Sequence, residues 1–378
     1  SFEQSFCRKA ATSKENKKEA HPTSKKNSEK YRKEGLYTEN DFSHVPTELR
    51  AVLSHTANFS LSKSTWSTYK TALNRLKDCE IDTNAKLDLP LDEKKILIFI
   101  GYLLNKKLAA STIDSYLSGL RQAQIAAGMG DMNLRTPLIK QILRGRKNQS
   151  LSERNNSRER LPVTPAILKV MKDYLKKSEL HPERKLLIWC IASIGFNGGF
   201  RIHEILPQNK KTYDPFKTLL REDVSLATVE VEGENIQTIQ IRLKTEKTNR
   251  SKKHTIVDLY QSKNSICPVN AFIKWSTARE KCEETLPLFL DEEGQSFTGR
   301  RFNLFLDGFV KARFPKIEGK ITSHSFRAGL ATMLGQLGYS DEEIKSSGRW
   351  SSRAFLEYLK LPRTQRANMA RELANLVI

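Results

Sequence analysis

A histidine and an arginine stand three positions apart in the otherwise apolar stretch ITSHSFRAGLATM at 321–333. Three residues is close to one helical turn. His324 and Arg327 would therefore leave the same face of a helix at its first turn, where backbone N–H groups also point outward. A lone histidine is usually structural, but this pair at a helix N-terminus predicts a site for an anion.

A second pair of charges lies in GFNGGFRIHEIL at 195–206, where Arg201 and Glu204 are one turn apart between apolar neighbours. Such a couple is often a surface ion pair that adds little stability. The apolar flanks favour instead a partly buried arginine, held by Glu204, whose guanidinium faces an oxyanion.

A cluster of basic residues occupies LKTEKTNRSKK and the residue after it, at 243–254. A lysine on a hairpin loop at this place could swing over a bound ligand, whereas the cluster alone indicates only a hairpin that contacts phosphates. The basic side chains are Lys244, Lys247, Arg250, Lys252, Lys253 and His254.

A tyrosine, Tyr358, lies between apolar residues in GRWSSRAFLEYLK at 348–360. Taken alone, this segment favours an amphipathic tyrosine that packs in the core. The order of the four features along the chain favours a functional role for Tyr358 instead, because together they form a known arrangement.

Arg201, a hairpin lysine, the HxxR pair and then Tyr358 resemble, in this order, the tyrosine recombinase (phage integrase-like) superfamily. GFRIHEIL resembles the first-arginine motif with its acidic partner, SHSFRAGLATML the HxxR box, and GRWSSRAFLEYLK the nucleophile segment. The resemblance runs from about residue 46 to the end, and the last segment is most similar to eukaryotic Crypton and DIRS type transposon recombinases.

The resemblance implies a site-specific recombinase or integrase that cuts and rejoins DNA. Arg201, supported by Glu204, and Arg327 would clamp the nonbridging oxygens of the scissile phosphate, and His324 would add a hydrogen bond or act as general base. Tyr358 would attack to leave a 3′-phosphotyrosyl link, while the hairpin lysine would protonate the departing 5′-oxygen. No metal, ATP or other cofactor is expected.

Two positions stay open. Alignment of the family's lysine-threonine pattern with the strand that follows favours Lys247 as the general acid, with Lys244 as the substitute. The family usually has His or Trp nine residues before the tyrosine, a count that reaches Arg349, whereas Trp350 is eight before. Either Trp350 packs on the phosphate site or Arg349 adds a third cation there.

The elements that must position these residues are mostly helices, with one small antiparallel sheet from three alternating runs between 228 and 259. We expect a flexible basic arm at 1–45, a helical core-binding domain at 46–146, a polar linker at 147–160 and a catalytic domain at 161–378. The last two helices of the catalytic domain are expected at 352–359 and 362–376. In the core-binding domain, four basic residues are candidates for DNA-backbone contacts or for a merely solvated helix face: Arg121, Lys140, Arg144 and Arg146.

The composition agrees with a polyanionic partner. The formal net charge is +21 from 64 Lys and Arg against 43 Asp and Glu, which favours double-stranded DNA as the partner. Recombination joins two duplexes with four active sites, so the resemblance implies a homotetramer on DNA that forms through dimers. Five cysteines, none in a metal-ligand spacing, favour a reducing compartment without structural zinc, and we expect a soluble nuclear protein with no membrane contact.

Two rivals share much of this pattern. A domesticated DNA-binding protein would still bind DNA but would have lost the cutting and rejoining activity. An enzyme similar to type IB topoisomerases would use the same Arg, Lys, His and Tyr chemistry to relax one duplex as a monomer.

Overall fold

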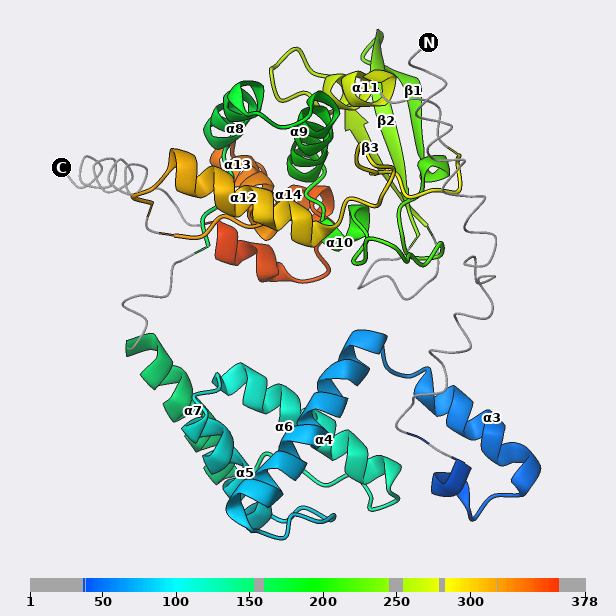
Figure 1. Ribbon diagram of the computed structural model, residues 1–378, viewed down its shortest axis with the longest axis vertical. Coiled ribbons are helices and arrows are strands. Elements are labelled where there is room, and N and C mark those ends of the chain that lie inside the picture. Colours follow the sequence, from blue (N-terminus) through cyan, green and yellow to red (C-terminus); the bar gives the residue numbers. More distant parts are fainter. Residues whose placement is uncertain are drawn as a thin grey trace, which may run out of the picture. The chain divides into compact units, whose positions relative to one another are not determined.

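The computed structural model describes residues 37, 39–152, 160–244, 254–278, 283–317 and 319–359. These residues form two compact units, one before residue 158 and one from that residue on (Figure 1). The helix predicted at 362–376 lies outside the described residues.

The unit before residue 158 is helical, as its sequence pattern predicts. Phe99, Leu103 and Leu117 are fully buried in its core. Helices α4 and α6 approach closely at Gly119, where a Cβ would lie 3.0 Å from the Cα of Tyr69. The described elements are η1 (Glu39–Phe42), α3 (Thr47–Asn58), α4 (Lys63–Thr83), α5 (Glu93–Asn105), α6 (Ala110–Ala126) and α7 (Pro137–Ser152).

Two expected boundaries shift in this unit. The arm predicted at 1–45 includes η1, and the Arg50 side chain donates hydrogen bonds of 2.7 Å to the carbonyls of Val45 and Ser43. The linker predicted at 147–160 begins inside α7, which continues to Ser152. The apolar periodicity stops at these polar residues, but the helix continues. An exposed helical turn needs no apolar face, and no proline interrupts this one.

The unit from residue 158 on holds a larger core with α9 at its centre. The α9 residues from Leu187 to Phe196 are buried without interruption, as expected for a helix that is apolar on every side. The helices of this unit are α8 (Pro165–Lys177), α9 (Pro182–Asn197), α10 (Ile202–Ile205), η3 (Arg221–Asp223), α11 (Pro268–Ala278), α12 (Gly299–Arg313), α13 (His324–Gln336), α14 (Asp341–Ser347) and η4 (Arg353–Tyr358).

The small antiparallel sheet confirms the predicted meander. Strands β1 (Val224–Val231), β2 (Glu234–Leu243) and β3 (Thr255–Tyr260) pair in that order. Ile241 of β2 lies between Val224 of β1 and Val257 of β3. Alternate residues of β2 turn inward, so Ile239, Ile241 and Leu243 are buried, while Gln240 is half-buried and Arg242 is exposed. Helix α11 contacts β2 and β3 (Figure 1).

The mostly helical fold with its small antiparallel sheet is therefore confirmed. None of the helices in the described ranges is both long and apolar enough to cross a bilayer.

Candidate active site

A sharp turn at the end of α9 places Arg201. Gly199 follows α9 with φ +54°, and a Cβ on it would lie only 2.7 Å from the Cδ2 of Leu330 in α13. Glycine is the residue that accepts both the left-handed backbone and the close approach. The turn lets Arg201 become the N-cap residue of the short helix α10, next to α13.

Arg201 and Glu204 form the partly buried couple that the sequence predicts. The Arg201 Nη1 donates to Glu204 Oε1 at 2.7 Å, and the Arg201 backbone N–H donates to Glu204 Oε2 at 2.9 Å. The Glu204 side chain is 2% exposed. Burial raises the pKa of Glu204, but the charge of Arg349 and the hydrogen bonds from Arg201 outweigh burial and hold this pKa below its usual value.

Arg349 reaches the same carboxylate from a distant part of the chain. Its Nη2 donates to Glu204 Oε2 at 3.1 Å, and its Nη1 donates to the carbonyl of Gly198 at 2.8 Å. The guanidinium also lies 4.6 Å from the centre of the Phe200 ring. Arg349 has φ +55°, in the turn that follows α14. The site thus contains a third guanidinium, one of the two alternatives for this position.

The Arg327 side chain is buried close to these groups, and the residue is 2% exposed. It donates to the carbonyl of Gly199 and, at 3.4 Å, to that of Arg349. Its guanidinium carbon lies 4.3 Å from the centre of the Trp350 ring, a cation–π contact. Trp350 therefore packs on the arginine of the HxxR box, and its role at a phosphate stays a prediction. Burial and the charge of Arg201 lower the pKa of Arg327 to about 10, which leaves it charged at neutral pH.

His324 begins α13 and is half-buried on the same side of the unit. Burial lowers its pKa below the usual value of 6.5, and the charges of Arg160, Arg327, Arg201 and His203 add to this effect. A histidine surrounded by cations is neutral at neutral pH, so it can accept a proton or donate one hydrogen bond.

Tyr358 ends η4, a 3-10 helix in place of the helix predicted at 352–359. The Thr332 hydroxyl of α13 donates to the Tyr358 carbonyl at 2.8 Å. The half-buried side chain packs against a small cluster that includes Trp350 and Phe355. Trp350 of this cluster is the ring on which the Arg327 guanidinium lies, so the tyrosine packs next to the residue that contacts the arginine of the HxxR box.

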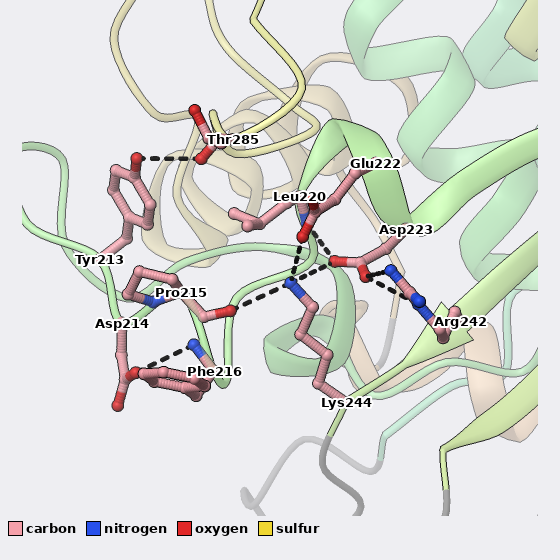
Figure 2. Close-up of polar contacts among 10 residues, drawn as sticks. All are labelled: Tyr213, Asp214, Pro215, Phe216, Leu220, Glu222, Asp223, Arg242, Lys244 and Thr285. Atoms are coloured by element: carbon pink, nitrogen blue, oxygen red, sulfur yellow. Dashed lines mark hydrogen bonds and ion pairs between the residues drawn. The ribbon is translucent and has the colours of Figure 1, made fainter. Parts of the chain in front are cut away.

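Lys244, the residue that follows β2, is engaged by other contacts (Figure 2). Its Nζ lies 2.7 Å from Asp223 Oδ2, and it donates to the carbonyl of Pro215 at 3.1 Å. Asp223 is fully buried and also accepts from Arg242 at 3.0 Å. The sequence gives no hint of this aspartate, because an acidic pair after an arginine is typical of an exposed turn. Lys247, Arg250 and Lys252 lie outside the described residues.

The four basic residues proposed for the DNA backbone divide into two kinds. Arg121 forms an exposed ion pair with Asp131, and Arg146 donates to the carbonyls of residues 107 and 108, so both have partners within their own unit. Lys140 and Arg144 are exposed one turn apart on α7. Arg121, Lys140 and Arg144 therefore keep the surface position that a contact with DNA needs, whereas Arg146 is half-buried.

Neither the models of known protein families nor the sequences of curated proteins match this chain. Solved structures do. The integrase of the Tn1549 transposon, in complex with transposon right end DNA, is 16% identical with a TM-score of 0.52 over 83% of this chain and 95% of that chain. The XerH site-specific recombinase, in a post-cleavage complex with palindromic difH substrate, is 14% identical with a TM-score of 0.56 over 88% and 86%. At such low identity the similarity shows the fold: the chain has the architecture of these recombinases.

Proposed function

We propose that this chain is a site-specific DNA recombinase of the integrase type, which cuts and rejoins DNA through a covalent link to Tyr358. The observation that carries the proposal is a group of three guanidiniums: those of Arg201 and Arg349 bind the buried carboxylate of Glu204, and that of Arg327 donates to the backbone carbonyl of Arg349. Three positive charges against one negative leave an excess suited to a phosphodiester. Tyr358 supplies a hydroxyl nucleophile in the same unit.

The proposed chemistry follows from these groups. The Tyr358 oxygen attacks the scissile phosphorus and passes its proton to the neutral imidazole of His324, while the bond from phosphorus to the 5′-oxygen breaks. Arg201 and Arg327 stabilise the charge that spreads over the nonbridging oxygens. Lys247 protonates the departing 5′-oxygen. A 5′-hydroxyl from a partner strand then reverses the step, so the phosphodiester bond energy is kept.

Lys247 is the better proton donor of the two hairpin lysines. Lys244 is held by the buried carboxylate of Asp223 and by the carbonyl of Pro215, and its side chain is 13% exposed. A lysine engaged in this way would have to leave a buried anion unpaired before it could reach a DNA strand, which is costly.

The partner that we propose is double-stranded DNA. The net charge of +21 favours a polyanion, and two recombinases with the same fold were solved with DNA. A homotetramer on DNA, a nuclear location and a role in moving a eukaryotic mobile element complete the proposal. The tetramer rests on the resemblance to tyrosine recombinases, which join two duplexes with four active sites. The location and the mobile-element role rest on the resemblance of the nucleophile segment to eukaryotic transposon recombinases.

A trapping experiment tests the proposal without knowledge of the target site. The full chain is incubated, in EDTA, with a pool of nicked duplexes of randomised sequence, and covalent adducts are isolated under denaturing conditions and sequenced. We expect adducts enriched in one sequence, lost in Tyr358→Phe and Arg327→Ala. Tyr358→Phe should still bind that sequence in a mobility-shift assay. Tight selective binding by the wild type without any adduct would favour a non-catalytic DNA-binding protein instead.

A further inference from the structure

Arg160 is held beside the start of α13 by backbone pairing. It forms a parallel bridge with Lys320, and the next residue, Leu161, donates its N–H to the Lys320 carbonyl at 3.1 Å. Two residues later, Val163 donates its N–H to the carbonyl of Ser325 at 2.9 Å. Residues 160–163 therefore run alongside the segment that leads into the HxxR box.

A close contact fixes this pairing. Val163 is fully buried, and a Cβ on Gly329 of α13 would lie 1.9 Å from the Val163 carbonyl oxygen. Only glycine permits that approach, so the position of the segment relative to α13 is set by packing. The backbone of Arg160 is thereby placed by buried contacts, although its side chain is exposed.

Several basic groups act on His324. After burial, Arg160, Arg327, Arg201 and His203 each lower its pKa. After burial, Arg160 has the largest effect, ahead of the arginine one turn along α13. Within the described residues, the Arg160 guanidinium has no hydrogen-bond or ion-pair partner. A cation held next to other cations without a partner is suited to an anion from outside.

We propose that Arg160 is an additional DNA-phosphate-binding residue of this site, which contacts the scissile phosphate or the phosphate next to it beside His324. The inference rests on the proposed function. The simpler alternative is an exposed arginine that only adds positive charge to the surface. The backbone pairing and the basic groups that act on His324 favour the specific role.

Two substitutions separate these cases. Arg160→Gln removes the charge and Arg160→Lys keeps it, and Lys169→Gln removes an exposed charge on α8 as the matched control. With the sequence selected by trapping, we expect Arg160→Gln to slow adduct formation on the order of 10-fold or more, the loss of one charge-assisted hydrogen bond. Arg160→Lys should retain most of the rate and Lys169→Gln all of it.

A second readout follows the His324 imidazole by NMR titration of the free protein, assigned with His324→Gln. The pKa of His324 should rise in Arg160→Gln and stay near the wild-type value in Arg160→Lys and Lys169→Gln. The acidic limb of the cleavage profile should move to higher pH in the same variant. A purely structural role for Arg160 would not produce this pattern.

The outcomes are distinguishable. Equal cleavage rates and equal His324 titrations in Arg160→Gln and wild type would overturn the inference while leaving the proposed function intact. Failure of the wild type to form any adduct would defeat the proposed function, and the phosphate-binding role with it. Circular dichroism shows whether Arg160→Gln is folded; if it is not, the placement of Arg160 as an exposed residue is wrong.

Discussion

Glu204 and Arg349 are 145 positions apart in the chain, yet Oε2 of the glutamate lies 3.1 Å from Nη2 of the arginine. The same carboxylate binds Arg201 through its other oxygen at 2.7 Å. One buried anion thus joins the first-arginine turn to the segment that carries Tyr358. Its charge also limits the repulsion among the guanidiniums, which would otherwise oppose their approach.

Replacing this anion should cost stability. Glu204→Gln keeps the shape but leaves Arg201 and Arg349 without a counter-charge, so the free energy of unfolding should fall by about 3 kcal/mol in urea denaturation. Because the folded-state pKa of Glu204 is lowered, its contribution is complete above the ordinary carboxyl value of 4.5 and is lost as pH falls through the folded-state pKa. The gap between wild type and variant should close in that acidic range. A difference in stability that does not depend on pH would contradict this role. Glu342→Gln, at an exposed position of α14, should show no such loss of stability.

The contact between Trp350 and Arg327 can be disturbed without touching either residue. Gly348 has φ −92°, which any residue tolerates, but a Cβ there would lie 1.5 Å from the Trp350 ring. Gly348→Ala should lower the free energy of unfolding by about 1–3 kcal/mol through overpacking and should also slow adduct formation. Gly308→Ala on α12 is the control, because nothing lies within 4 Å of its Cβ. It should be neutral or stabilising by up to about 1 kcal/mol. Equal behaviour of the two alanine variants would show that Trp350 does not fill this space.

The two hairpin lysines should differ in how they respond to the leaving group. Lys247→Ala should lose on the order of 10²–10⁴-fold in cleavage of ordinary DNA, and a bridging 5′-sulfur should restore cleavage because a thiolate leaves without a proton. Lys244→Ala should instead lower the midpoint of urea denaturation, since it leaves Asp223 buried with one partner fewer. Strong cleavage by Lys247→Ala, together with sulfur rescue of Lys244→Ala, would reverse the assignment.

Cleavage should persist to a lower pH than an ordinary histidine would permit. Burial and the surrounding arginines lower the pKa of His324, so the neutral form needed as general base is present at pH 6.5 and is lost only below that value. The rate of adduct formation, measured from pH 8 downward under single-turnover conditions, should therefore decline with an apparent pKa below 6.5. His324→Gln should be slow at every pH and lack this limb. An acidic limb with an apparent pKa above 6.5 would show that a group other than His324 controls the rate.

Much of the fold follows from local pattern. Apolar spacing predicts the helices and the alternation from 228 to 259 predicts the meander, because each of these elements buries one face against the core. The boundary at 147 fails for a local reason, since polar residues continue α7 to Ser152 as readily as they form a linker. Likewise, η4 is a 3-10 helix where the spacing alone predicts an ordinary helix.

The sequence by itself determined which residue types could act on a phosphate, because the order of Arg201, the HxxR box and Tyr358 is readable without coordinates. It could not choose between Arg349 and Trp350. In the tertiary structure Arg349 binds Glu204 and Trp350 packs on Arg327. Only tertiary structure decided that Lys244 is held by Asp223 and that Arg160 lies beside the HxxR segment. Contacts of this kind depend on where distant segments cross in a packed core, and a pattern of neighbours along the chain contains no information on those crossings.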